Sequence, residues 1–389
     1  MNNVPGATAL PSPESRIHGC LLGGALGDSL GYAIEFDSIT AIRGRFGEAG
    51  LQDFEALDGG SHFSDDTQMT LYTVDGLVEV LEWANSGVGA DANACLWLAY
   101  LRWLDTQGVP APEQAPRPQP RWIDGQPVLR HRRAPGNACL SGLATGEMGT
   151  VYRPVNPDSK GCGTVMRSAP FGLIPHIPAE SVYKLSADAA SLTHGHPSAR
   201  QSAGVFSLLI HSLIQGHTLA EAAQAAVQHV QSDADAVPEL RERLAAALRL
   251  AGLANGAGTA TRPVLSPEDL VSELGEGWVA EEVLAVGLYA VLATAPGAAP
   301  AESSAPAESS APAEISAPHR AADPVEHFKA AIALAINHSG DSDSTGSIAG
   351  NILGAYYGED CLPADWLGAL EAPEVIRGMA DQLVSVTTG

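Results

Sequence analysis

Two short segments of the sequence carry residues that could bind a metal ion. Their oxygen-bearing side chains belong to Ser64, Asp65, Asp66, Asp341, Asp343 and Ser344. Carboxylate and hydroxyl oxygens are the ligands that hard cations such as Mg²⁺ prefer. A helix cap is the alternative for each segment, because Ser and Asp at a helix start accept hydrogen bonds from its free N–H groups.

The second segment also resembles the start of an EF-hand calcium loop. Such a loop requires a bidentate glutamate at its twelfth position, which is Ile352 when counted from Asp341, so this alternative is excluded. We expect Asp341 and Asp343 to lie on one side of an extended turn before a helix. Together the two segments favour a site for two Mg²⁺ ions about 3.5–4 Å apart, since clustered aspartates would repel one another without a cation.

Glycines recur every fourth residue near the start of the chain, at Gly19, Gly23, Gly27 and Gly31. On a helix they would form one ridge without side chains, at a cost of about 1 kcal/mol each relative to alanine. Such a ridge lets a second helix or a ligand approach closely, and we favour helix packing. Glu35 follows this segment and could either face the metal centre or be solvated.

A glycine-bearing loop over residues 159–167 (SKGCGTVMR) precedes an apolar stretch. Backbone N–H groups in such loops can bind a pyrophosphate, although the spacing of a Walker motif is absent here. His194 and His196 could be metal ligands by residue type. Because the acidic segments favour a hard ion, we expect these histidines to have a structural or ligand-contacting role.

Helices must position these residues, since period-two strand patterns are scarce and alanine- and leucine-rich stretches with helical spacing recur. The predicted helices cover residues 16–33, 66–84, 91–105, 199–215, 219–232, 238–254, 280–293 and 325–337. Asp65 followed by Gln68 matches a capping box, and Pro238 marks a helix start. The predicted fold is all-α, a compact multi-helix bundle.

The chain is long enough, at 389 residues with 45% hydrophobic residues, for a single large domain. We expect a flexible N-terminus over 1–15 and one domain over 16–388. The AESSAP repeat at about 296–320 is too poor in large apolar residues to pack, so it predicts a disordered insert. The proline- and arginine-rich stretch 108–133 is expected to be an ordered connection.

The composition also limits where the protein acts and on what. No secretory signal or long apolar run is recognisable, and the five cysteines form no CxxC pair, which predicts a cytoplasmic protein with reduced thiols and no membrane contact. The formal net charge is −24, from 45 acidic and 21 basic residues. That charge opposes attraction to nucleic acid.

The motifs GCLLGGALGDSLG, SDDTQM, KGCGTVMR, THGHP and GDSDSTG, in this order, resemble those of the ADP-ribosylglycohydrolase family, which includes the dinitrogenase-reductase-activating glycohydrolases. The resemblance runs from about residue 16 to about 358, without the AESSAP repeat. It implies an all-α orthogonal bundle with a binuclear magnesium site at one end. The implied activity is cleavage of the glycosidic bond to the distal ribose of ADP-ribose.

The resemblance also implies a role for each matching residue. The two acidic segments correspond to the metal ligands, with Ser64 and Ser344 where the family most often has Thr; serine retains the hydroxyl oxygen. Glu35 is similar in position to a mobile glutamate near the metals. The implied ADP-ribose contacts are Gly161, Cys162 and Gly163 on a diphosphate-binding loop, and His194 near the ribose or adenine.

The predicted function is Mg²⁺-dependent removal of ADP-ribose from modified protein. Arginine is the favoured acceptor, because the motifs most resemble bacterial arginine-type members. Metal-associated water would attack the anomeric carbon, with the catalytic carboxylates drawn from Glu35, Asp65, Asp66, Asp341 and Asp343. The alternatives are a hydrolase of serine-linked or nucleic-acid-linked ADP-ribose, a non-catalytic ADP-ribose-binding protein, and a glycosidase acting on another nucleoside or sugar.

Overall fold

A computed structural model describes residues 10–58, 60, 62–253, 264–295 and 323–387. The α-helices are α1 (Pro13–Tyr32), α2 (Ile39–Phe46), α3 (Asp65–Asn85), α4 (Ala92–Thr106), α5 (Asn137–Ala144), α6 (Ala169–Gly172), α7 (Ala179–Ala190), α8 (Pro197–Ile214), α9 (Leu219–Ser232), α10 (Pro238–Leu250), α11 (Pro267–Leu274), α12 (Ala280–Ala293), α13 (Pro324–Ile336), α14 (Ser342–Tyr357), α15 (Ala364–Ala369) and α16 (Pro373–Thr387). Short 3₁₀ helices are η1 (Phe54–Ala56), η2 (Trp122–Gly125), η3 (Pro127–Leu129), η4 (Cys162–Thr164) and η6 (Gly358–Cys361). The described residues form no β-strand; Gly161 and Val279 make an isolated bridge.

The predicted all-α class is confirmed, and each predicted helix is present with ends shifted by a few residues. Helix α1 begins at Pro13, so residues 13–15 are helical and the expectation of a flexible segment over 1–15 is wrong at this boundary. Residues 1–9 and the AESSAP repeat lie outside the described residues. Helices α2, α5, α6, α7, α11, α15 and α16 were not predicted.

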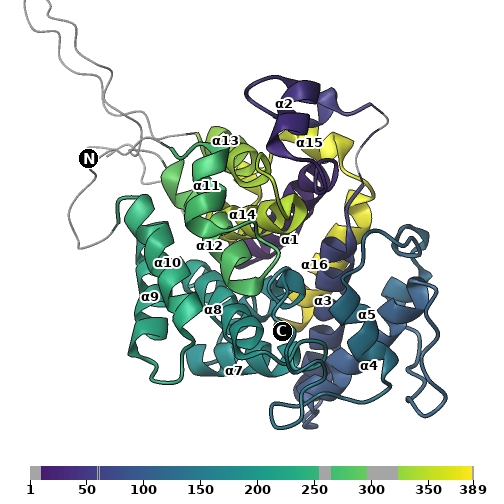
Figure 1. The fold of residues 1–389 in the computed structure, drawn as a ribbon. Helices are drawn as coiled ribbons and strands as arrows, with labels where there is room; N and C mark the ends of the chain where they lie inside the picture. The colour runs from purple at the N-terminus through teal and green to yellow at the C-terminus, as the bar shows by residue number, and fades with distance from the viewer. Residues whose placement is uncertain (1–9, 59, 61, 254–263, 296–322, 388–389) are drawn as a thin grey trace, which may run out of the picture.

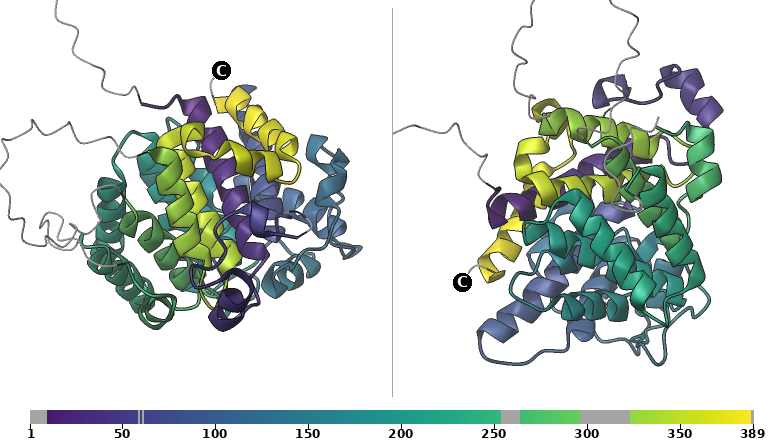
Figure 2. Two further views of the ribbon diagram at one scale, coloured as in Figure 1. Left: turned by 90° about the horizontal axis from the view of Figure 1, so that it is seen from above. Right: turned by 90° about the vertical axis from the view of Figure 1, so that its left-hand side faces the viewer.

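Helices α1 and α14 lie against each other at the centre of the bundle (Figures 1 and 2). The predicted glycine ridge of α1 makes this contact, so helix packing is the confirmed role of the ridge. A Cβ atom at Gly23 or Gly27 would overlap the backbone of Gly350 or Gly346 on α14. The two backbones can approach this closely only because neither helix carries side chains there.

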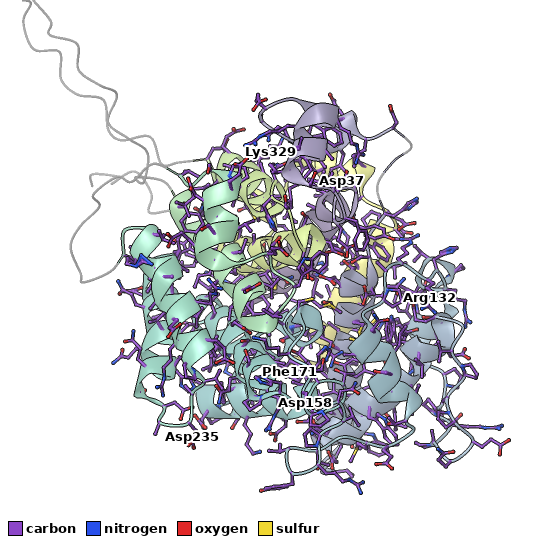
Figure 3. The ribbon with its side chains drawn as sticks, in the orientation of Figure 1. Asp37, Arg132, Asp158, Phe171, Asp235 and Lys329 are labelled. Carbon is purple, nitrogen blue, oxygen red and sulfur yellow. The ribbon has the colours of Figure 1, made fainter. Side chains whose placement is uncertain are left out.

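The other helices pack on both sides of this central pair. Helix α3 packs against α4 and α16 on one side, whereas α8 and α12 contact α14 on the other (Figure 1). Charged side chains such as Arg132, Asp158 and Asp235 are exposed, while Phe171 is buried in the bundle (Figure 3). No helix in the described part of the chain is sufficiently long and apolar to cross a membrane.

Candidate functional site

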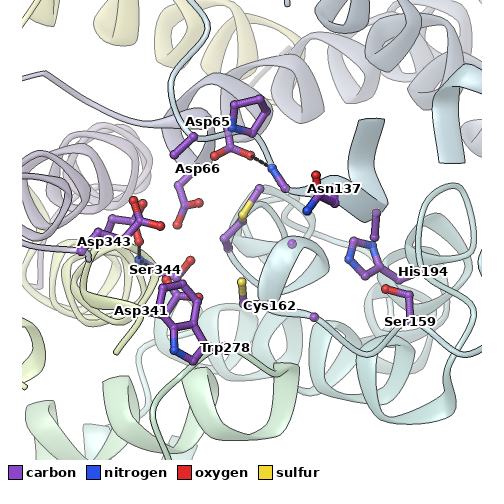
Figure 4. A pocket seen from close by; sticks show the side chains of 18 of the residues that line it. Asp65, Asp66, Asn137, Ser159, Cys162, His194, Trp278, Asp341, Asp343 and Ser344 are labelled. Atoms are coloured by element: carbon purple, nitrogen blue, oxygen red, sulfur yellow. Dashed lines mark hydrogen bonds between the residues drawn. The ribbon is translucent and has the colours of Figure 1, made fainter. Parts of the chain in front are cut away.

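One cavity of about 800 Å³ brings the predicted site residues together (Figure 4). Its lining includes Glu35, Asp65, Asp66, Gly161, Cys162, Gly163, His194, Asp341, Asp343 and Ser344. Ser64 is fully buried and lies outside this lining. The volume is in the range of about 300–1,000 Å³ that is typical of small-molecule sites. The cavity can therefore hold a ligand that contacts acidic residues from both ends of the sequence.

The first acidic segment forms the start of α3. Ser64 is the N-cap, and its hydroxyl accepts a hydrogen bond from the backbone N–H of Asp66 at 3.1 Å. Asp65 and Asp66 are therefore in the first helical turn, where the helix dipole favours negative charge. The predicted capping box between Asp65 and Gln68 is wrong, because the Gln68 amide is buried and donates instead to the carbonyl of His131 at 2.8 Å.

The second acidic segment forms the start of α14. Asp341 is the N-cap and accepts a hydrogen bond from the backbone N–H of Ser344 at 3.3 Å. Asp343 lies inside the first turn and accepts from the same N–H at 2.8 Å. The expected extended turn is wrong for Asp343, because the helix begins at Ser342. Capping and the proposed metal binding are thus compatible, since each carboxylate has two oxygens.

Asp28 of α1 supports the start of α3 and was missed as a site residue. Its buried carboxylate accepts hydrogen bonds from the backbone N–H groups of Ser64 at 2.9 Å and Thr67 at 3.0 Å, and from the Thr67 hydroxyl. Burial and the charge of Asp343 raise the pKa of Asp28 to about 7. An aspartate inside an apolar, glycine-rich helix was the sequence signal for this role.

If the acidic segments bind Mg²⁺ as the sequence predicts, replacing Asp28 with Asn is expected to lower the affinity for Mg²⁺ about 10- to 100-fold, as loss of a residue that orients metal ligands typically does. The amide of Asn would direct a donor toward the N–H groups that the carboxylate now binds. Mg²⁺ titrations of activity measure this effect. The exposed Asp235→Asn substitution is the matched control, and an unchanged Mg²⁺ requirement in Asp28→Asn would contradict the supporting role.

Five carboxyl groups line one side of the cavity, which we call the acidic wall: those of Glu35, Asp65, Asp66, Asp341 and Asp343. Burial, followed by the charge of Asp343, raises the pKa of Glu35 to about 10, and the same two causes raise those of Asp65, Asp66 and Asp341 well above the ordinary value. The buried oxygens Glu35 Oε2, Asp66 Oδ2 and Asp341 Oδ2 have no hydrogen-bond partner. A bound cation would compensate these charges and supply the missing partner.

The described side chains are not arranged in a ready coordination geometry for a metal ion. Among them, no group of three or more His, Cys, Asp or Glu residues already surrounds a point where a metal ion could sit. Both acidic segments nevertheless line the same cavity, and their oxygens suit Mg²⁺.

The opposite wall contains the glycine loop and His194 (Figure 4). The N–H of Cys162 donates to the carbonyl of Trp278 at 3.1 Å, so it is not free to bind a phosphate as the sequence indicated. A Cβ atom at Gly163 would lie 2.9 Å from the His194 ring, so glycine permits this close contact. Burial and then the charge of Arg167 lower the pKa of His194 to about 3, which keeps its ring neutral.

The second histidine of the THGHP motif has a structural role. His196 is the N-cap of α8, where its ring accepts a hydrogen bond from the backbone N–H of Ser198 at 3.1 Å. This confirms the structural alternative for His196. The ring of His194 instead faces the cavity, with Nδ1 2.8 Å from the hydroxyl of Thr193.

Two aromatic residues at the cavity were missed by the sequence reasoning. Phe36 and Trp278 both line it, and their rings are nearly parallel, with centroids 6.2 Å apart and an interplanar angle of 17°. Phe36 lies next to Glu35, and Trp278 precedes α12 after a glycine-containing turn. Proximity to Glu35 was the only sequence signal, since neither aromatic belongs to one of the acidic or glycine-loop motifs.

Comparisons with known proteins identify similar chains. The family model described as ADP-ribosylglycohydrolase matches residues 9–389. ADP-ribosylhydrolase ARH3 of Gallus gallus is 24% identical over 402 residues, covering 95% of this chain and 93% of that protein. ADP-ribosylarginine hydrolase Tri1 of Serratia proteamaculans is 41% identical over 58 residues, or 15% of this chain and 16% of Tri1.

A solved structure shares the fold. It is described as an "ADP-ribosylglycohydrolase-related protein complex" and matches with a TM-score of 0.60 at 24% sequence identity. The match covers 96% of this chain and 99% of the other. At this identity the likeness supports the helical architecture alone.

Proposed function

Because this chain belongs to the ADP-ribosylglycohydrolase family and is therefore a glycosidic-bond hydrolase, we propose that it removes ADP-ribose from modified protein in a Mg²⁺-dependent reaction. One observation carries the proposal. The acidic starts of α3 and α14 line one cavity together with the glycine loop and His194. Such a cavity can bind the distal ribose at its acidic wall and the remainder of ADP-ribose toward the loop.

Two Mg²⁺ ions would be held by the six oxygen-bearing residues at the starts of α3 and α14. These residues are Ser64, Asp65, Asp66, Asp341, Asp343 and Ser344. The unpartnered buried oxygens of Asp66 and Asp341 support this assignment. The chemistry that Mg²⁺ supplies when bound is polarisation of ribose hydroxyls and of a water molecule.

The protein's own residues would position and stabilise the reacting sugar. The buried carboxylates at the acidic wall stabilise the electron-poor transition state at the anomeric carbon. One of them accepts a proton from the attacking water as the bond between the anomeric carbon and the acceptor breaks, and the departing acceptor then takes up a proton. Glu35 is a candidate for this proton transfer, because its Oε2 atom is buried without a partner and its side chain lines the cavity. Neutral His194 can contact the ribose or adenine without adding charge.

Arginine is the acceptor that we favour. The local match to a protein named ADP-ribosylarginine hydrolase supports this choice, whereas the much longer match to ARH3 carries no acceptor in its name. The net charge of −24 opposes binding of a polyanionic nucleic acid. We also propose a cytoplasmic location, because all five cysteines are free thiols and structural disulfides are rare in that compartment.

Removal of Mg²⁺ is the experiment that tests this function. Purified protein is incubated with arginine-, serine- and base-linked ADP-ribose substrates, first with Mg²⁺ and then after chelation. We expect release of ADP-ribose from the arginine-linked substrate, a loss of about 100-fold or more after chelation, and recovery when Mg²⁺ is restored. The loss follows because the ribose hydroxyls and the water molecule would no longer be polarised by Mg²⁺.

Three results would change the proposal. Tight binding of ADP-ribose without release from any substrate would identify a binding protein. Release from the serine- or base-linked substrate alone would overturn the arginine assignment. Full activity after complete removal of divalent cations would overturn the Mg²⁺ requirement.

A further inference from the structure

Two aromatic side chains are exposed beside the acidic wall. The relative exposure is 74% for Phe36 and 38% for Trp278, although both rings are large and apolar. They stack on each other instead of packing into the core, and both line the cavity. Exposed apolar surface that lines a cavity is characteristic of a binding site.

The backbone holds this aromatic pair next to the acidic residues. Phe36 directly follows Glu35, and the residue before Trp278 contacts the second acidic segment. Gly277 has φ of +93°, and a Cβ atom there would lie 3.2 Å from the Cβ of Asp341. The backbone N–H of Asp341 also donates to the carbonyl of Glu276 at 2.8 Å. Trp278 is therefore close to Asp341 for reasons of backbone packing.

The position of Phe36 and Trp278 indicates which part of a substrate they would contact. If the proposed function holds, the anomeric carbon lies at the acidic wall and the ADP portion extends toward the glycine loop and His194 (Figure 4). The modified protein is too large to enter a cavity of about 800 Å³. Its acceptor side chain must therefore approach the anomeric carbon from solvent, past the exposed rings.

We propose that Phe36 and Trp278 form an acceptor-recognition site that selects a guanidinium group. This inference rests on the proposed function and assigns residues to its acceptor specificity. A planar guanidinium stacks on aromatic faces and gains cation–π attraction, which is strongest with Trp. A serine side chain has neither the charge nor the plane for such a contact.

The charge around the pair is compatible with a cationic acceptor. Five carboxylates line the cavity, from Glu35, Asp65, Asp66, Asp341 and Asp343, whereas Arg132 is the only Arg or Lys in the lining described. The two Mg²⁺ ions of the proposed function would offset most of the charge of these carboxylates, so the wall would carry at most a small net negative charge. The aromatic faces therefore select the guanidinium group, and the charge of the wall does not oppose it.

The test compares two peptides of identical sequence that differ only in whether ADP-ribose is linked to arginine or serine. Phe36→Leu and Trp278→Leu are each expected to lower the ratio of kcat/KM for the arginine-linked to the serine-linked peptide about five- to tenfold, mainly through KM. Phe36→Tyr and Trp278→Phe retain an aromatic face and should largely restore the ratio. Affinity for free ADP-ribose should change less than twofold in all four variants.

Tyr152→Leu is the matched control, because Tyr152 is 98% exposed and lies outside the cavity lining. Equal losses with both peptides, or weaker binding of free ADP-ribose, would overturn acceptor recognition and assign the rings to the ADP-ribose portion. An unchanged ratio in both leucine variants would also overturn it while leaving the hydrolase function intact. A wild type that cleaves neither peptide contradicts the proposed function and this inference together. If only the arginine-linked peptide is cleaved, free ADP-ribose affinity serves as the reference.

Discussion

Replacing Asp343 with Asn is expected to lower kcat/KM for ADP-ribose release about 100- to 1,000-fold, the range typical when one electrostatic contact to a transition state is removed. Asp343 is the carboxylate whose charge acts on Asp28, Glu35, Asp65, Asp66 and Asp341. Asn keeps the size and polarity of the side chain but removes the charge. The loss should therefore reflect the proposed metal centre and its stabilisation of the transition state.

Thermal unfolding separates this effect from a folding defect. Without Mg²⁺, Asp343→Asn should melt at the same temperature as the wild type or higher, because one charge has been removed from a buried group of like charges. Addition of Mg²⁺ should raise the melting temperature of the wild type but not that of the variant. Asp235→Asn, on the surface, should behave like the wild type. Full activity of Asp343→Asn at low Mg²⁺ would show that the binuclear assignment is wrong.

Gly350→Ala is expected to destabilise the protein by about 3 kcal/mol or more, since overpacking that forces backbone shifts has costs of this order. A Cβ atom at Gly350 would overlap the carbonyl of Gly23 and lie 3.0 Å from the backbone nitrogen of Gly24. These are backbone atoms of α1, so no side-chain rotation can relieve the overlap. The separation of α1 and α14 would have to increase.

Urea denaturation of the wild type and variant measures this destabilisation. Gly44→Ala in α2 is the matched control, because a Cβ atom there would meet no atom within 4 Å. Alanine is the better helix former by about 1 kcal/mol, so the control should be as stable as the wild type or more so. Wild-type stability in Gly350→Ala would contradict the close packing of α1 against α14.

Local patterns predicted the helices where apolar spacing was regular, as in α9 and α12, whose bounds agree with the predicted ranges. Helix α16 was missed although Val375, Ile376, Met379 and Leu383 have helical spacing and are buried. The start of α14 was less predictable. Its Ser, Asp, Thr and Gly residues have low intrinsic helix propensity, and packing against α1 outweighs that preference.

The sequence by itself determined the chemical types in the candidate site and the helix start that carries Asp65 and Asp66. These features depend on residue type and short-range hydrogen bonding. Only the tertiary structure decided that Asp28 supports the start of α3 and that Trp278 lies beside Asp341. The same holds for the hydrogen bond that the N–H of Cys162 donates to the carbonyl of Trp278. Those contacts join residues distant in sequence through the packing of α1 against the start of α3 and of the turn before α12 against the start of α14 and the glycine loop, which local periodicity does not encode.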